Sequence, residues 1–112
     1  MFETIRIDTD ARGVATLWLA RSDKHNALSQ QMMEELTEAA SQLGADPKVR
    51  VVVLAGEGAS FCAGGDLAWM KSQIGADAET RRAGARVLAQ MLVALNTLPK
   101  PLIGRVHGNA FG

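Results

Sequence analysis

The feature that most constrains the fold is an amphipathic helix pattern followed at once by an almost uninterrupted apolar run. The apolar run covers residues 49–55, and Arg50 is its single charged member. Such a run is typical of a strand that is buried on both faces. Ahead of it, apolar side chains recur every three or four positions, as on one face of a helix; they are Met32, Met33, Leu36, Ala39, Ala40 and Leu43. A helix that leads into a buried strand favours an α/β fold with crossover connections.

This predicted helix has recognisable signals at both ends. Ser29 is placed to cap its first turn, because a serine hydroxyl can accept a hydrogen bond from a free N–H group there. Gly44 supplies a C-terminal stop, and Pro47 prevents the helix from continuing. We therefore expect a helix that begins near residue 30 and ends near Gly44.

Other segments complete the pattern on either side. Residues 5–8 alternate between apolar and polar side chains, and residues 14–20 form a second apolar run, which predicts a hairpin of two strands. Further along, the spacing predicts a short helix over residues 66–71, a long helix over about 78–96 and another buried strand over 102–106. Three strand–helix units and the beginning of a fourth account for the chain.

Composition and charge exclude several classes of function. The 112 residues carry 12 basic and 12 acidic side chains without a basic stripe, which argues against a nucleic-acid partner. No apolar run approaches the roughly 20 residues of a membrane helix, and the first residues lack the regions of a signal peptide. One cysteine cannot form an internal disulfide. We therefore expect a cytoplasmic protein that binds neither nucleic acid nor a membrane.

Two adjacent glycines follow the central strand and precede the short helix. Gly64 and Gly65 have no side chains, so a ligand can approach their backbone N–H groups. The start of a helix next to them adds free N–H groups and a favourable dipole, and such a site stabilises a phosphate or a developing oxyanion. The alternative is a tight strand-to-helix turn without a ligand. The spacing matches neither the dinucleotide fingerprint nor the P-loop.

The side chains around these glycines allow both structural and functional interpretations. Asp66 can cap the short helix or orient a ligand, and Lys24 can pair with a phosphate or remain solvated. Cys62 favours a small buried hydrophobe over a redox thiol, because no second cysteine or adjacent base accompanies it. His25 and His107 lack metal-ligand spacing, so we predict structural or surface roles for them and no metal site. No residue qualifies as the general acid or base.

The methionines offer the same choice between packing and contact with a ligand. We expect core packing for Met32, Met33, Met70 and Met91, although Met70 lies close in sequence to the glycine pair.

Four segments, taken in order, resemble the crotonase family of enoyl-CoA hydratases and isomerases. They are KHNAL at residues 24–28, VVVLAG at 51–56, FCAGGDL at 61–67 and PKPLIGRVHGNAFG at 99–112. The third resembles the family signature Phe-x-Ala-Gly-x-Asp-Leu/Ile, and the fourth resembles the approach to the family's Gly-Gly-Gly loop. Two positions depart from the pattern: Ser22 stands where proline is frequent, which should loosen the loop slightly, and Gly65 stands where alanine is common, which keeps the backbone donor with more flexibility.

The resemblance implies an α/β fold, a spiral of β-β-α units, in which residues 1–112 form the N-terminal part of a single domain that continues into a C-terminal half. It implies an acyl-CoA thioester as substrate, water addition to its α,β-unsaturated acyl group through an enolate, and no cofactor, because coenzyme A belongs to the substrate. Gly65 would be the first oxyanion donor, with the second donor and the acidic residues beyond Gly112. The residues implied to line the site are Lys24, Ala27, Ala63, Gly64, Gly65, Asp66, Leu67 and Ala68.

Finer expectations follow from the same resemblance. Trp69 and Met70, together with residues 105–108, are most similar to hydratases of branched, methylglutaconyl-type CoA esters, and the family commonly forms trimers and paired trimers. Acyl-chain specificity and the choice between hydratase and isomerase stay open. One alternative of another class is a non-catalytic fragment with residual CoA binding or an assembly role.

Overall fold

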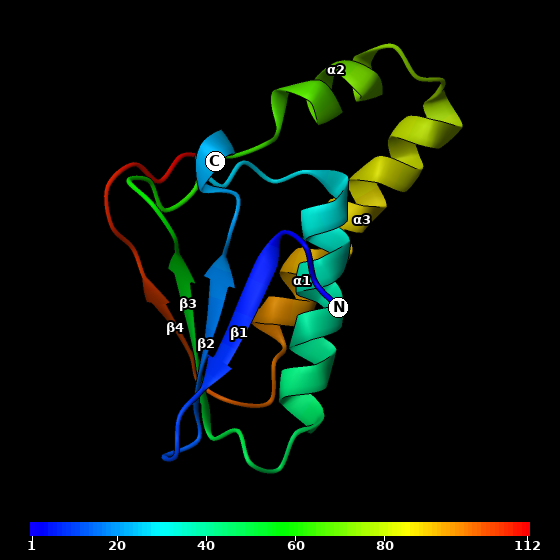
Figure 1. Cartoon of the computed structure of the whole chain (residues 1–112). Helices are drawn as coiled ribbons and strands as arrows, with labels where there is room; N and C mark the ends of the chain where they lie inside the picture. The colour runs from blue at the N-terminus through cyan, green and yellow to red at the C-terminus, as the bar shows by residue number, and fades with distance from the viewer.

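The structure, a computed structural model, describes residues 1–112 and contains one four-stranded sheet. Its strands are β1 (Ile5–Thr9), β2 (Val14–Leu19), β3 (Val51–Gly56) and β4 (Leu102–Arg105), in the spatial order β1-β2-β3-β4. β1 runs antiparallel to β2, whereas β2, β3 and β4 are parallel to one another. The carboxyl ends of the three parallel strands therefore lie at the same edge of the sheet, and the loops that follow them meet there (Figure 1).

Three α-helices and one short 3₁₀ helix connect the strands. They are η1 (Ser22–Lys24), α1 (Gln30–Ala45), α2 (Leu67–Ile74) and α3 (Ala78–Asn96). The predicted helices are all present, but α1 continues through Gly44 and α2 continues three residues past Lys71. Gly44 does not end α1 because the backbone first becomes extended at Asp46, the residue before Pro47.

The hydrophobic core lies between the sheet and helices α1 and α3, which both cover the same face (Figure 1). Its buried members come from the first three strands, from α1 and α3, and from the segments just before and after β3. They are Ile5, Ala15, Leu17, Leu19, Met32, Met33, Leu36, Ala39, Leu43, Val49, Val52, Cys62 and Met91. Helix α2 and the first half of α3 extend beyond this layer (Figure 1). The loops at the carboxyl edge are therefore bordered by the sheet on one side and by this projecting pair on the other.

Three packing predictions were wrong. The strand expected over residues 102–106 was predicted to be buried, yet β4 ends at Arg105 and is exposed from Ile103 on, because it is an edge strand. Strand β3 was expected to be buried on both faces, yet Val51 and Val53 are only partly buried, because they lie on the face of the sheet that the helices leave open. Met70 was expected in the core but is 38% exposed, since α2 projects past the sheet and none of its residues is fully buried. Met32, Met33 and Met91 are buried as expected. No helix is both long and apolar enough to cross a membrane.

Candidate functional site

The glycine pair forms a sharply turned loop between β3 and α2. Gly64 has a φ of +87°, a left-handed conformation that side chains disfavour. It also lies against the end of the chain, because a Cβ atom added there would come within 3.3 Å of the Phe111 carbonyl oxygen. The backbone angle therefore favours glycine at this position, and the contact with Phe111 leaves little room for a side chain.

Hydrogen bonds to the residues before and after Gly65 fix its position, but its own N–H group has no partner in the protein. Leu28 N–H donates to the Gly64 carbonyl over 2.7 Å, and Asp66 N–H donates to the Leu28 carbonyl over 3.0 Å. These bonds form a parallel bridge between Leu28 and Gly65. The Gly65 N–H donates no hydrogen bond within the protein. A donor that is fixed in position and unpaired can bind an anion or stabilise a developing oxyanion.

The last residues of the chain run alongside this loop. Phe61 and Cys62 donate their N–H groups to the Asn109 carbonyl over 2.9 and 3.2 Å, and Phe111 N–H donates to the Cys62 carbonyl over 2.9 Å. Gly112 Cα would lie 3.5 Å from a Cβ added to Gly64. The fold therefore brings the second glycine-containing loop next to the first.

The loop of residues 24–28 is anchored to the same place by Asn26. This side chain is fully buried, and its amide nitrogen donates to the carbonyls of Glu57, Ser60 and Phe61 over 2.8, 3.0 and 3.2 Å. Ala63 N–H donates to the His25 carbonyl over 2.9 Å. Three loops from distant parts of the sequence are thereby joined around Gly65.

Asp66 caps α2, which agrees with the structural interpretation of this residue. Its Oδ1 accepts the Trp69 N–H over 2.9 Å, and its Oδ2 lies 3.1 Å from Arg21 Nη2. The hydrogen bond from Trp69 and the paired Arg21 guanidinium lower the pKa of the Asp66 carboxyl, and together they outweigh the effect of its burial. Asp66 is therefore ionised and already engaged on both oxygens.

The other predicted site residues surround Gly65 to different degrees. Ala27 is buried, with 8% exposed, and precedes Leu28, which bonds to Gly64 and Asp66. Ala63, Leu67 and Ala68 are exposed beside it. Lys24 is exposed and forms no ion pair within the protein. The structure thus places residues 27 and 63–68 together, whereas it gives no contact that ties the Lys24 side chain to them.

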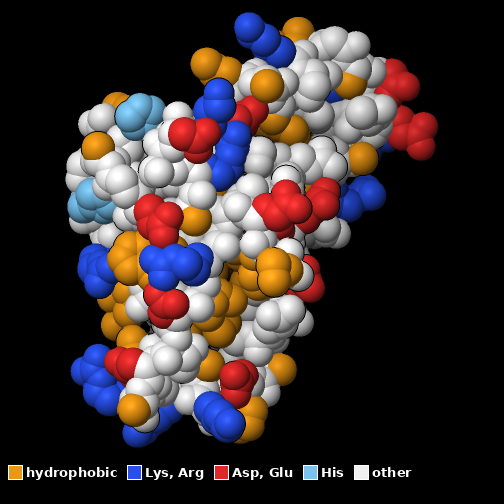
Figure 2. All heavy atoms as spheres, in the orientation of Figure 1, with side chains coloured by type: hydrophobic (Ala, Val, Ile, Leu, Met, Phe, Trp, Pro, Cys, Tyr) orange, Lys and Arg blue, Asp and Glu red, His pale blue; other side chains and the backbone are white.

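Cys62 and the two histidines have structural contacts. Cys62 is 9% exposed, and its Sγ donates to the Asn26 carbonyl over 3.3 Å. His25 and His107 are exposed, and Figure 2 shows both pale-blue side chains on one side of the molecule. His25 Nδ1 lies 3.2 Å from Ser60 Oγ, and His107 Nε2 donates to the Gly58 carbonyl over 2.7 Å. These contacts fit the structural roles expected for all three residues.

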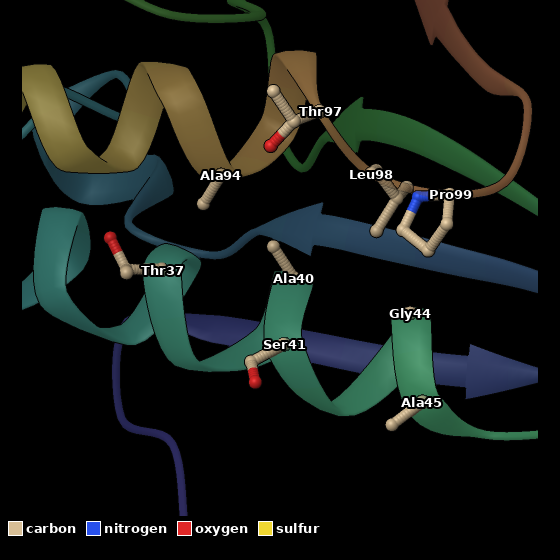
Figure 3. A pocket seen from close by; sticks show the side chains of 9 residues that line it. All are labelled: Thr37, Ala40, Ser41, Gly44, Ala45, Ala94, Thr97, Leu98 and Pro99. Carbon is tan, nitrogen blue, oxygen red and sulfur yellow. The ribbon is translucent and has the colours of Figure 1, made fainter.

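A separate cavity of about 390 Å³ lies between α1 and the end of α3 (Figure 3). Its lining consists of small or apolar residues, and these are Thr37, Ala40, Ser41, Gly44, Ala45, Ala94, Thr97, Leu98 and Pro99. None of them carries an acid or a base that titrates near neutral pH. The glycine loop is therefore the better candidate for chemistry.

Sequence reasoning missed two candidate residues of this site. Arg21 was assigned only to a polar loop, but its guanidinium reaches Asp66, 45 positions away. Leu28 takes part through its backbone, which no side-chain pattern reveals. No local sequence pattern signals the pairing of Arg21 with Asp66, because the two residues lie 45 positions apart.

The chain is similar to known enoyl-CoA hydratases over almost its whole length. It is 36% identical to an enoyl-CoA hydratase of Alternaria alternata, covering 99% of this chain and 37% of that protein. A probable enoyl-CoA hydratase of Mycobacterium tuberculosis is 38% identical, with 93% of this chain and 39% of that protein covered. The chain thus spans about two fifths of the length of these curated relatives.

Solved structures give the same result for the fold. The crystal structure of an enoyl-CoA hydratase from Shewanella pealeana has a TM-score of 0.95 and 35% identity, over 99% of this chain and 42% of that one. An enoyl-CoA hydratase from Mycobacterium smegmatis has a TM-score of 0.87 and 40% identity, over 95% of this chain and 40% of that one. The α/β fold is therefore that of the N-terminal portion of crotonase-type proteins, as predicted. Because the enoyl-CoA hydratase/isomerase family model also matches residues 9–112, the chain belongs to the enoyl-CoA hydratase/isomerase family.

Proposed function

We propose that the protein containing this chain acts on acyl-CoA thioesters as a hydratase or isomerase, and that Gly65 N–H binds the thioester oxygen. The observation that carries the proposal is the free Gly65 N–H, fixed between the two hydrogen bonds that Leu28 makes with its neighbours. When water adds to the β-carbon of an α,β-unsaturated thioester, negative charge moves to the thioester oxygen. A donor that is already oriented stabilises this charge without reorganisation.

The surroundings of Gly65 support this assignment. The first turn of α2 begins two residues later, and the positive end of its dipole favours negative charge. Asp66 is held by Arg21 and Trp69, so it is not available to transfer a proton. We therefore assign the proton transfers and the second donor to the remainder of the complete protein, in agreement with the family resemblance.

The remaining assignments rest on the resemblance and on the positions of the residues. Ala27 and residues 63–68 would line the thioester and the adjacent part of coenzyme A, and Lys24 would meet a phosphate group. A branched glutaconyl-type acyl group, a trimeric or hexameric assembly and a cytoplasmic location stay predictions.

The test compares two substitutions at Gly65 in the complete protein. Gly65→Pro removes the N–H, whereas Gly65→Ala keeps it, and the added Cβ would meet only the flexible Met70 side chain at 3.2 Å. We expect Gly65→Pro to lower kcat for enoyl-CoA hydration on the order of 100- to 1000-fold, the usual effect of removing one oxyanion donor. Gly65→Ala should lose far less.

Circular dichroism and thermal unfolding of both variants serve as the folding control. Equal turnover by two folded variants would reject the role of the Gly65 N–H. Direct titration of crotonyl-CoA and a branched enoyl-CoA into the 112-residue chain examines the alternative, a fragment that binds CoA without catalysis. Binding of the ligand without any hydration by the complete protein would favour that alternative.

A further inference from the structure

Arg21 makes a set of contacts that connects the loop of residues 24–28 to the start of α2. Its guanidinium donates through Nη1 to the Ala27 carbonyl and through Nη2 to Asp66 Oδ2, 3.1 Å away. The side chains of Arg21 and Asp66 are only 18% and 14% exposed. The pair is thus largely shielded from water, where an ion pair has a stronger effect than at an exposed surface.

The backbone of Arg21 is held as firmly as its side chain. Arg21 N–H donates to Asn26 Oδ1 over 2.8 Å, and the Arg21 carbonyl accepts the Asn26 N–H over 2.9 Å. Because Asn26 is itself bonded to the turn of residues 57–61, the guanidinium has a rigid support. Arg21 can therefore hold Asp66 at a defined position.

Asp66 places a negative charge directly after the free N–H of Gly65. An unpaired carboxylate there would repel the enolate oxygen that this N–H is proposed to bind. With Arg21 paired to it, the charge of Asp66 is compensated, and the same contact fixes the peptide that follows Gly65. The lowered pKa of Asp66 is consistent with this arrangement, since it keeps the carboxylate ionised for both the helix cap and the arginine.

We propose that Arg21 is a positioning residue of the oxyanion site, which cancels the charge of Asp66 and holds the Gly65–Asp66 segment in place. The inference rests on the proposed role of Gly65. It differs from a merely structural ion pair, because it assigns unequal consequences to the loss of each partner. Without Arg21, the uncompensated Asp66 carboxylate would repel the developing oxyanion. Without the charge of Asp66, the Arg21 guanidinium remains as a nearby cation.

The experiment measures hydration of crotonyl-CoA by the complete protein in four forms: wild type, Arg21→Met, Asp66→Asn and the double variant. We expect Arg21→Met to lower kcat and kcat/KM together by about 10- to 100-fold, as for loss of transition-state stabilisation by a nearby charge. Asp66→Asn keeps a side chain that caps helices well, so it should lose much less. In the double variant, removal of the uncompensated charge should restore most of the activity lost in Arg21→Met.

Arg12→Met is the matched control. Arg12 is paired with Asp10 in the β1–β2 hairpin, at the opposite end of the sheet from Gly65 (Figure 1), and its side chain is 79% exposed. Its loss should leave turnover unchanged. If Arg21→Met does not fold, Arg21→Gln keeps a donor for the Ala27 carbonyl and removes the same charge, so it replaces Arg21→Met in all comparisons.

Equal losses in Arg21→Met and Asp66→Asn, with no recovery in the double variant, would overturn the inference and leave a structural ion pair. The Gly65→Pro and Gly65→Ala comparison separates this failure from failure of the proposed function. If those two variants differ as expected while the double variant shows no recovery, only the role of Arg21 is wrong. If they have equal activity, both proposals are wrong.

Discussion

At the scale of single residues, Asn26 shows how one buried side chain can arrange a site. It has a φ of +56°, and asparagine tolerates this left-handed conformation better than most residues. Its amide group has hydrogen-bond partners on both sides, with the oxygen accepting from Arg21 and the nitrogen donating to three carbonyls. A buried polar group is stable only when it is satisfied in this way. Asn26 therefore determines where the loops around Gly65 meet.

Glu35 has a comparable role in α1, where it holds the N-terminal segment through Glu3 and Thr4. Glu35 is buried, with 9% of the residue exposed, and its carboxylate accepts hydrogen bonds from Thr4 N–H over 2.8 Å, from Thr4 Oγ1 over 2.6 Å and from Glu3 N–H. Burial by itself raises the pKa of this carboxyl, but the hydrogen bonds from Thr4, Glu3 and Gln31 outweigh it and lower the pKa overall.

This environment predicts a pH dependence of stability. Because the pKa is lower in the folded protein than the ordinary value of 4.5, ionised Glu35 stabilises the fold above that pH, and this contribution is lost as the pH falls through the folded pKa. Glu35→Gln should cost about 2 kcal/mol at neutral pH and reduce the loss of stability toward pH 3. Urea unfolding between pH 3 and 7 measures both effects. Glu34→Gln, an exposed neighbour, is the control, and an equal change in both variants would contradict the prediction.

At the scale of elements, the helices begin where short polar side chains satisfy their first N–H groups. Ser29, Asp66 and Asp77 are the N-caps of α1, α2 and α3, and each accepts a hydrogen bond from the N–H three residues later. In α2 the capping bond also helps to fix the candidate site, because the capping residue Asp66 directly follows Gly65. The same local rule therefore sets a helix start and orients a candidate functional loop.

The cap of α1 gives a prediction that is independent of the site. Ser29 Oγ accepts the Met32 N–H over 3.2 Å, so Ser29→Ala should lower the free energy of unfolding by about 1 kcal/mol. Ser41→Ala, at an exposed position within the same helix, should be neutral or slightly stabilising because alanine favours helix more than serine does. Urea titration of both variants measures the difference. Equal stabilities would show that the capping bond contributes nothing.

At the scale of the whole molecule, the sheet has one covered and one open face. The open face holds Trp18, whose ring lies 5.1 Å from the Arg6 guanidinium and 5.0 Å from that of Arg105. Ile103 on the same face is 52% exposed, and β4 is an edge strand. Figure 2 shows other hydrophobic side chains reaching the surface between charged ones. An open edge and exposed apolar residues favour association with another chain.

We expect the 112-residue chain to associate as its concentration rises, and Ile103→Lys to reduce this association. Lysine on an edge strand opposes pairing because its charge would be buried. Thr9→Lys, which adds the same charge at an exposed position on the other edge strand, is the matched control and should have a smaller effect. Sedimentation velocity at several concentrations measures the result. A chain that stays monomeric throughout would refute the expectation.

The sequence by itself determined the elements and the candidate loop of this protein. The helical spacing from Met32 to Leu43, the cap at Ser29 and the glycine pair depend on residues a few positions apart, so short-range rules were sufficient to predict them. Only the tertiary structure decided that Arg21 pairs with Asp66, that Phe111 lies against Gly64 and that one face of β3 stays open. These features depend on which strands become neighbours and which faces the helices cover, and no local pattern carries that information, because burial is a property of the assembled sheet and helices.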